Sequence, residues 1–179
     1  QAVTCAASRV SQLVNDLLAY SHLQQLTEQS EPVDLAGCLH TVAAPFRDEL
    51  EARSGELKVV MPDDLRVQAN PKGLAIVLRN LIGNALKFSR DSHPPVVQIG
   101  ARLEAGHRVI WVRDNGVGFD MKYHDRMFGI FQRLHRAEEF PGTGVGLALV
   151  AKAVQRMGGR VWAESSPGAG ATFYLEFPE

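Results

Sequence analysis

Apolar side chains recur at alternating spacings of three and four residues at the start of the chain, which predicts one long helix over residues 1–29. No proline or glycine interrupts this stretch. The apolar stripe comprises Val3, Ala6, Val10, Leu13, Leu17 and Tyr20, and it is widened by Val14, Leu18 and Leu23. Such a stripe is typical of a coiled-coil seam. Because a solitary helix cannot bury it, we expect a partner, either another helix of the parent protein or a second copy of the chain.

A proline at position 32 ends this helical pattern, because proline restricts the residue before it and cannot continue the helical hydrogen bonds. Residues 30–34 are therefore predicted to be a linker. The folded domain is expected to span residues 35–179, and residues 1–29 to be a separate helical segment.

The rest of the chain mixes helical and strand patterns. Helices are expected at 35–53, 71–90 and 145–157, and strands at 55–62, 65–69, 95–104, 107–115, 159–165 and 171–177. The helix at 71–90 is amphipathic, and its inward residues are expected to be Leu74, Val77, Leu78, Leu81 and Leu86. This order predicts an α+β fold, a two-layer α/β sandwich with a mixed sheet and helices on one face.

The amino-acid composition excludes only a few classes of protein. The chain has 179 residues, of which 45% are hydrophobic, and this suits one globular domain with a helical appendage. No run approaches the roughly 18 apolar residues of a membrane helix, and the net charge of −1 gives no reason to expect a nucleic-acid partner. Cys5 and Cys38 lack metal-ligand spacing, so reduced thiols and a cytoplasmic location are expected. Gln1 opens directly into a helix, which indicates a fragment of a longer protein.

Three short stretches carry side chains whose pattern indicates chemistry rather than packing. In "NLIGNALKF", Asn80, Asn84 and Lys87 share one helix face because they are spaced by four and three residues. Amide oxygens can coordinate magnesium and a lysine can neutralise phosphate, so this face suits a metal–polyphosphate complex. The alternative is an ordinary solvated helix face.

The second stretch, "RDNGVGFD", ends a strand in a glycine-rich turn. The Asp114 carboxylate can accept a hydrogen bond from an exocyclic amine, and Gly116 and Gly118 let the backbone approach a flat ligand. The alternatives are a calcium loop or a plain turn that ends a strand. A calcium loop is disfavoured because further carboxylates at alternate positions are missing.

The third stretch, "GTGVGLALV", places a glycine cluster at the start of an apolar helix, where exposed amides and the helix dipole favour an anion. It lacks the Gly-Lys-Ser/Thr ending of a Walker loop, and no βαβ unit surrounds it as in a Rossmann fingerprint. Alone, the cluster is weak evidence. The order and spacing of all three stretches are far more specific.

Together these stretches resemble the catalytic, ATP-binding domain of sensor histidine kinases, within the superfamily of gyrase, heat-shock chaperone and mismatch-repair ATPases. "NLIGNALKFS" is similar to the asparagine box of that family, "DNGVGF" and "GTGVGLALV" to its two glycine boxes, "MFGIFQRL" to its phenylalanine box and "SSPGAGATFYLEFP" to its closing hairpin. The match covers about residues 33–179 and is most similar to phytochrome-type kinases. It implies a Bergerat-type ATP-binding fold, with residues 1–29 as the second helix of a dimerisation bundle.

The resemblance also implies roles for individual residues. Asn84 would ligate Mg²⁺ on the phosphates of ATP, and Asn80 and Lys87 would approach the phosphates. Asp114 would hold the adenine amine. The further cofactor-binding residues implied are Phe88, Gly116, Gly118, Gly142, Thr143, Gly144, Gly146, Leu147 and Thr172. Phe88 departs from the family, since many relatives carry tyrosine there.

A lid over the nucleotide is implied for residues 119–141, with Phe128 and Phe131 anchoring it to the domain. Arg133, His135 and Arg136 are candidates to reach the phosphates when the lid closes, and a solvated basic loop is the alternative.

One position in the asparagine box bears on the reaction type. Hydrolysing members of the superfamily resemble one another in a glutamate four residues before the magnesium asparagine. This chain has Asn80 there, and a neutral amide cannot act as a general base. The sequence therefore favours transfer of the γ-phosphoryl group to a histidine outside the chain and then to a response-regulator protein. The parent would be a homodimer.

The histidine in "YSHLQQL" is not expected to be that acceptor. The family's acceptor histidine is followed by an acid and then by a proline, whereas His22 is followed by Leu23, with Leu26 where a proline would be sought. Three rival functions stay open at this point: a hydrolysing ATPase, a serine-directed kinase of the same superfamily, and a pseudokinase or dimerising scaffold.

Overall fold

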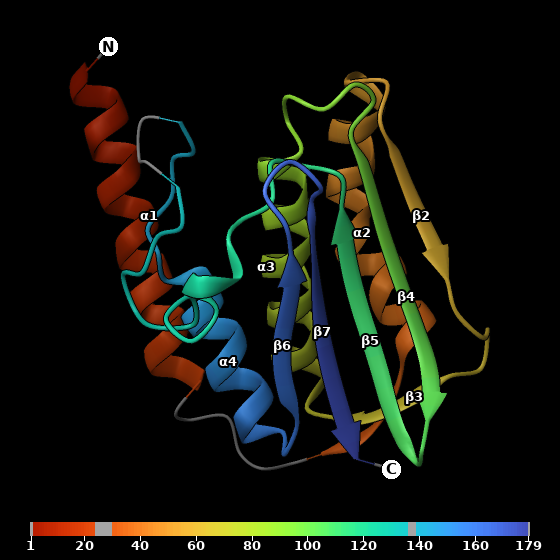
Figure 1. Cartoon of the computed structure of the whole chain (residues 1–179). Coiled ribbons are helices and arrows are strands. Elements are labelled where there is room, and N and C mark those ends of the chain that lie inside the picture. Colours follow the sequence, from red (N-terminus) through yellow and green to blue (C-terminus); the bar gives the residue numbers. More distant parts are fainter. Residues whose placement is uncertain (1, 24–29, 136–138, 179) are drawn as a thin grey trace.

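The structure is a computed structural model that describes residues 2–23, 30–135 and 139–178. A mixed five-stranded sheet with the order β2-β4-β5-β7-β6 forms one layer, and helices cover one of its faces (Figure 1). The strands are β2 (Glu56–Val60), β4 (Val96–Glu104), β5 (His107–Asp114), β6 (Arg160–Ser165) and β7 (Ala171–Pro178). Only β2 and β4 pair in parallel among these strands. The predicted two-layer α+β class is therefore confirmed.

Three helices form the second layer behind the sheet: α2 (Leu35–Ala52), α3 (Pro71–Phe88) and α4 (Gly146–Arg156). The helix α3 begins where predicted, because the Asn70 side chain accepts a hydrogen bond from the Gly73 amide and Pro71 occupies the first turn. All five leucine and valine residues predicted to face inward from α3 are buried. The pattern of α3 thus fixes which of its faces remains free for polar groups.

The segment predicted to be a linker is instead part of the fold. Strand β1 (Glu31–Asp34) pairs antiparallel with β3 (Arg66–Ala69) in a separate two-stranded sheet. Pro32 is tolerated because β1 has only one neighbour. The Asp34 side chain then caps α2 by accepting a hydrogen bond from the Ala36 amide. The linker prediction for residues 30–34 is therefore wrong for these four residues.

The N-terminal helix α1 (Ala2–Leu23) lies beside α4 and the lid segment, apart from the sheet (Figure 1). Its apolar stripe does not act as one seam. Leu23 is fully buried, and Leu13 and Tyr20 pack on the core. The exposed part of the stripe comprises Val10, Val14, Leu17 and Leu18. The predicted helical tail at residues 24–29 lies outside the described residues.

No helix among the described residues combines the length and the apolar character that crossing a bilayer requires.

Candidate functional site

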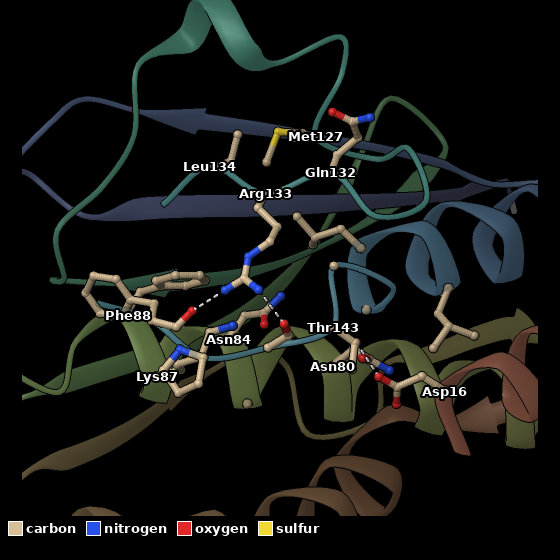
Figure 2. Close-up of a pocket in the computed structure, with 18 of the residues that line it drawn as sticks. Asp16, Asn80, Asn84, Lys87, Phe88, Met127, Gln132, Arg133, Leu134 and Thr143 are labelled. Carbon is tan, nitrogen blue, oxygen red and sulfur yellow. Dashed lines mark hydrogen bonds between the residues drawn. The ribbon is translucent and has the colours of Figure 1, made fainter. Parts of the chain in front are cut away.

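A cavity of about 1110 Å³ opens between α3, the N-terminus of α4, the lid segment and α1. Eleven of the thirteen residues predicted to bind the cofactor line it, all except Gly116 and Thr172. They come from segments that are up to 67 residues apart in sequence, from Asn80 to Leu147. Figure 2 shows side chains from α1, α3, the lid and the turn before α4 that converge on this space.

The polar face of α3 forms the floor of the cavity. Asn80 is held in place because its amide nitrogen donates to the Ile76 carbonyl at 2.9 Å. Its amide oxygen lies at the start of α4, where an added Cβ on Gly146 would come within 2.9 Å of it. The described residues give no hydrogen bond to the half-buried Asn84 side chain. Asn84 is thus available to a ligand.

Two cations meet at this end of the cavity. Burial lowers the pKa of the Lys87 ammonium, and the nearby Arg133 guanidinium lowers it further. Both effects oppose the charged form of Lys87 when the cavity holds no anion. A polyphosphate would reverse them, because it supplies the missing negative charge.

Asp114 also lines the cavity and lies at the end of β5. Its carboxyl is 4% exposed, and burial raises its pKa from 3.8 to about 6. Hydrogen bonds from the Gly116 amide, at 2.8 Å, and from the Ala171 backbone oppose this shift. A buried carboxylate whose desolvation is incompletely compensated is suited to accept a ligand donor.

The two glycines after Asp114 permit close backbone contacts within the protein. A Cβ on Gly116 would lie 2.2 Å from the Phe88 carbonyl oxygen, so this glycine lets β5 meet the end of α3. Gly118 has a φ of +61° and approaches the Ser166 carbonyl. Gly116 does not line the cavity, and its direct ligand role is corrected to orienting the Asp114 carboxylate.

Thr172 is also corrected, because its side chain lies on the opposite face of the sheet from Asp114. Asp114 pairs with Ala171, whereas Thr172 pairs with the exposed Arg113. Directly opposed residues share a face and successive residues alternate between faces. Ala171 and Phe173 line the cavity instead. The alternation of small or apolar with polar residues in "ATFYLEF" is the sequence signal that could have identified them.

The second glycine box forms the turn before α4. The N-terminus of α4 has no side-chain cap, and Gly146 and Leu147 of its first turn line the cavity. Gly144 adopts a φ of +73°, and its carbonyl accepts a hydrogen bond from the Phe131 amide at 2.9 Å. This hydrogen bond connects the lid to the start of α4, where a helix N-terminus can bind an anion.

The lid is anchored differently from the prediction. Phe128 is half-buried against the core, but Phe131 is 58% exposed and contributes through its backbone. Met127, which is 1% exposed, is the buried anchor that the sequence reasoning missed. His135 packs its ring 5.2 Å from those of Phe88 and Phe140, and burial lowers its pKa. Arg136 lies outside the described residues.

The Arg133 side chain connects two parts of the lid region through hydrogen bonds. Its guanidinium donates one hydrogen bond to the Gly142 carbonyl and another to the Phe140 carbonyl, both at 2.7 Å (Figure 2). This fork holds Arg133 against the segment that leads into α4.

We expect Arg133→Lys to loosen the lid although it keeps the charge, because a single ammonium cannot reproduce the planar fork. The variant should increase protease cleavage and amide hydrogen exchange within residues 119–135, with global stability changed by no more than about 1 kcal/mol. Arg126→Lys, at an exposed lid position, is the matched control. Equal amide hydrogen exchange in the two variants would contradict the role of the two Arg133 hydrogen bonds in holding the lid.

The residues fit a magnesium–nucleotide complex through amide and phosphate oxygens. Among the described residues no group of three or more His, Cys, Asp or Glu side chains could hold a metal ion alone. Asn84 lines the cavity and makes no hydrogen bond to the described residues. It has the hard oxygen donor that Mg²⁺ prefers, and Mg²⁺ usually completes its shell with water and phosphate.

These features define a nucleotide-binding class of protein, and comparison with known families agrees. Residues 69–179 match the family described as histidine kinase-, DNA gyrase B- and HSP90-like ATPases. The chain belongs to this family.

The relatives are sensor kinases and phytochromes. The chain is 36% identical over 172 residues to the phytochrome-like protein Cph1 of Synechocystis sp., and 38% identical over 179 residues to cyanobacterial phytochrome A of Nostoc sp.. These matches cover 96% of the chain but 22% of each relative, so the chain spans about a fifth of their length.

Solved structures show the same arrangement. Full-length ShkA in complex with AMPPNP superposes with a TM-score of 0.78 at 29% identity, covering 93% of this chain and 35% of that one. The histidine kinase AdeS of Acinetobacter baumannii has a TM-score of 0.78 at 22% identity, covering 99% of this chain and 82% of that one, and supports the fold.

Proposed function

We propose that the chain is the ATP-binding part of a two-component sensor histidine kinase and that it holds ATP for transfer of the γ-phosphoryl group to a histidine outside the chain. The observation that carries this is the set of polar groups that line one cavity. A buried carboxylate, Asp114, lines it together with Asn84, Lys87 and Arg133. The solved structure of ShkA in complex with AMPPNP supports a nucleotide ligand.

Transfer is favoured over hydrolysis because the position expected to carry a general base holds Asn80, whose amide nitrogen already donates to Ile76. We propose that Mg²⁺ is bound through Asn84 and the phosphates. His22 is exposed in the last turn of α1 and does not line the cavity, which agrees with an acceptor elsewhere.

The proposed partners are a response-regulator aspartate that receives the phosphoryl group, and the dimerisation helices of the parent homodimer. The names of the relatives, which include several sensor kinases, support the first. The exposed half of the α1 stripe supports the second, since it leaves four large apolar side chains uncovered. The cytoplasmic location remains a prediction.

Calorimetric titration with ATP, with and without Mg²⁺, tests the proposal. We expect binding that requires Mg²⁺ for full affinity and that falls strongly in Asn84→Ala, which removes the metal ligand but keeps a good helix former. Gln98→Ala on the sheet, outside the cavity, is the control. Absence of binding to well-folded protein would favour a scaffold.

Incubation with ATP labelled in the γ-phosphate tests the reaction. We expect neither phosphate release above background nor an acid-labile label on the chain alone. A label that disappears in His22→Gln would contradict the proposed acceptor, and steady phosphate release would restore the hydrolase as the better function.

A further inference from the structure

The helix α1 forms one wall of the nucleotide cavity. Leu13, Asp16 and Ala19 line the cavity together with α3 and the second glycine box. Figure 2 shows Asp16 reaching from α1 toward Thr143 and Asn80. The N-terminal helix is therefore in direct contact with the site.

Asp16 contacts the phosphate end of the cavity through one hydrogen bond. The Thr143 hydroxyl donates to the Asp16 carboxylate at 2.5 Å, across 127 positions of sequence. Thr143 lies between Gly142 and Gly144 in the turn that opens α4. A hydroxyl has one hydrogen to donate, so while it donates to Asp16 it cannot donate to a phosphate oxygen.

The negative charge of Asp16 also opposes phosphate binding. Among the described residues that line the cavity, Asp16 and Asp114 are the only acidic ones, and Asp16 is the one beside the glycine turn. A half-buried carboxylate at this place offsets the local positive charge of Lys87, Arg133 and the α4 N-terminus. It also repels the phosphates of an incoming nucleotide.

We propose that Asp16 competes with the nucleotide phosphates for Thr143 and the surrounding positive charge, so that the position of α1 sets the affinity for ATP. This inference rests on the proposed function. With α1 docked, the carboxylate occupies the hydrogen-bond donor of the glycine turn. Phosphate binding displaces the carboxylate, and any force that moves α1 away raises the affinity.

The docking of α1 is suited to such a shift because, among the α1 side chains that the structure describes, only one is fully buried. Leu23 is fully buried, whereas Leu13, Asp16 and Tyr20 are half-buried and Val10 is 61% exposed. A helix held mainly at its C-terminal end can change its contact near Asp16 without unfolding the domain.

Asp16→Asn is the first test, since asparagine keeps a hydrogen-bond acceptor and removes the charge. We expect affinity to rise by about two- to fivefold for ADP and for a non-hydrolysable ATP analogue with Mg²⁺, which is the size of effect typical of a partly exposed charge. Adenosine, which has no phosphate, should bind with unchanged affinity. Asp64→Asn, an exposed position outside the cavity, is the matched control for net charge.

Hydrogen exchange on the wild-type chain is the second test. Addition of the ATP analogue with Mg²⁺ should increase exchange of α1 amides around residues 12–20 relative to nucleotide-free protein, because the helix loses its contact with Thr143. Adenosine should leave that exchange unchanged.

Two outcomes would overturn the inference. Affinity for phosphate-bearing ligands that is unchanged or weaker in Asp16→Asn would show that Asp16 does not compete. Increased protection of α1 on nucleotide binding would show that the helix supports the loaded site. Both results are distinct from failure of the proposed function, in which the wild type would bind neither nucleotide.

Discussion

Asp114→Asn is expected to weaken ATP binding by at least about tenfold, because a hydrogen bond to a buried charged group contributes about 1.5 kcal/mol or more. The carboxylate lies at the end of β5 with 4% of its surface exposed, and two backbone amides already orient it. Asparagine keeps the size of the side chain and loses the negative charge that, in the proposed site, would accept a hydrogen bond from the adenine amine. Calorimetric titration of both proteins measures the difference.

The pKa of Asp114 makes this binding depend on pH. Because the free protein titrates this carboxyl at about 6, the fraction able to accept an amine falls about tenfold per pH unit well below that value. Affinity for ADP should therefore rise with pH up to about 6 and then level off. Inosine diphosphate, which has the same phosphates but no exocyclic amine, is the control. A constant ADP-to-inosine-diphosphate affinity ratio from pH 5 to 7, or equal ratios in wild type and Asp114→Asn, would contradict the role.

The same shift predicts a cost in stability. A folded-state pKa raised from 3.8 to about 6 means that the folded protein holds the proton more tightly than the unfolded chain. Stability from this group is present below about pH 4 and is lost as pH rises through about 6, by about 3 kcal/mol in total. Urea unfolding should show the stability of Asp114→Asn, relative to wild type, increasing over that window.

Much of the domain could be predicted from local pattern. The helix α3 carries its own start signals and a well-separated apolar face, and strands β4 and β5 alternate on either side of a turn at Ala105–Gly106. In each case the information lies within about 20 consecutive residues. The polar face of α3 lies opposite its buried apolar face, and Asn80, Asn84 and Lys87 on that polar face line the cavity.

The features that could not be predicted depend on contacts between segments that are far apart in the sequence. Strand β1 has four residues and pairs with a segment 35 positions later, which no local periodicity reveals. The stripe of α1 is split by its neighbours, since Leu13 packs against the core whereas Val10 stays exposed. The position of the Phe131 side chain could not be predicted for a different reason. Its φ of +62° turns the side chain outward, so an aromatic residue predicted to be an anchor contributes a backbone hydrogen bond instead.

Gly116→Ala is expected to destabilise the domain by about 3 kcal/mol or more, the upper part of the range for forced overpacking. The new Cβ would lie 2.2 Å from the Phe88 carbonyl oxygen and 2.8 Å from the Ser89 nitrogen. Both are backbone atoms at the end of α3, so no side-chain rotation relieves the clash. The melting temperature should fall by about 6–12 °C, and nucleotide affinity should fall as well, because the Gly116 amide orients Asp114.

Gly83→Ala separates this clash from the general effect of replacing glycine. A Cβ there would meet only the Phe46 ring, at 3.6 Å, which is an ordinary contact. Because Gly83 lies inside α3, the substitution should stabilise the domain by about 0.5–1 kcal/mol in thermal unfolding. Equal melting temperatures for the two variants would mean that β5 and α3 do not meet at Gly116. Opposite shifts would show that this contact, which joins the carboxylate end of the cavity to the asparagine helix, holds the two halves of the site together.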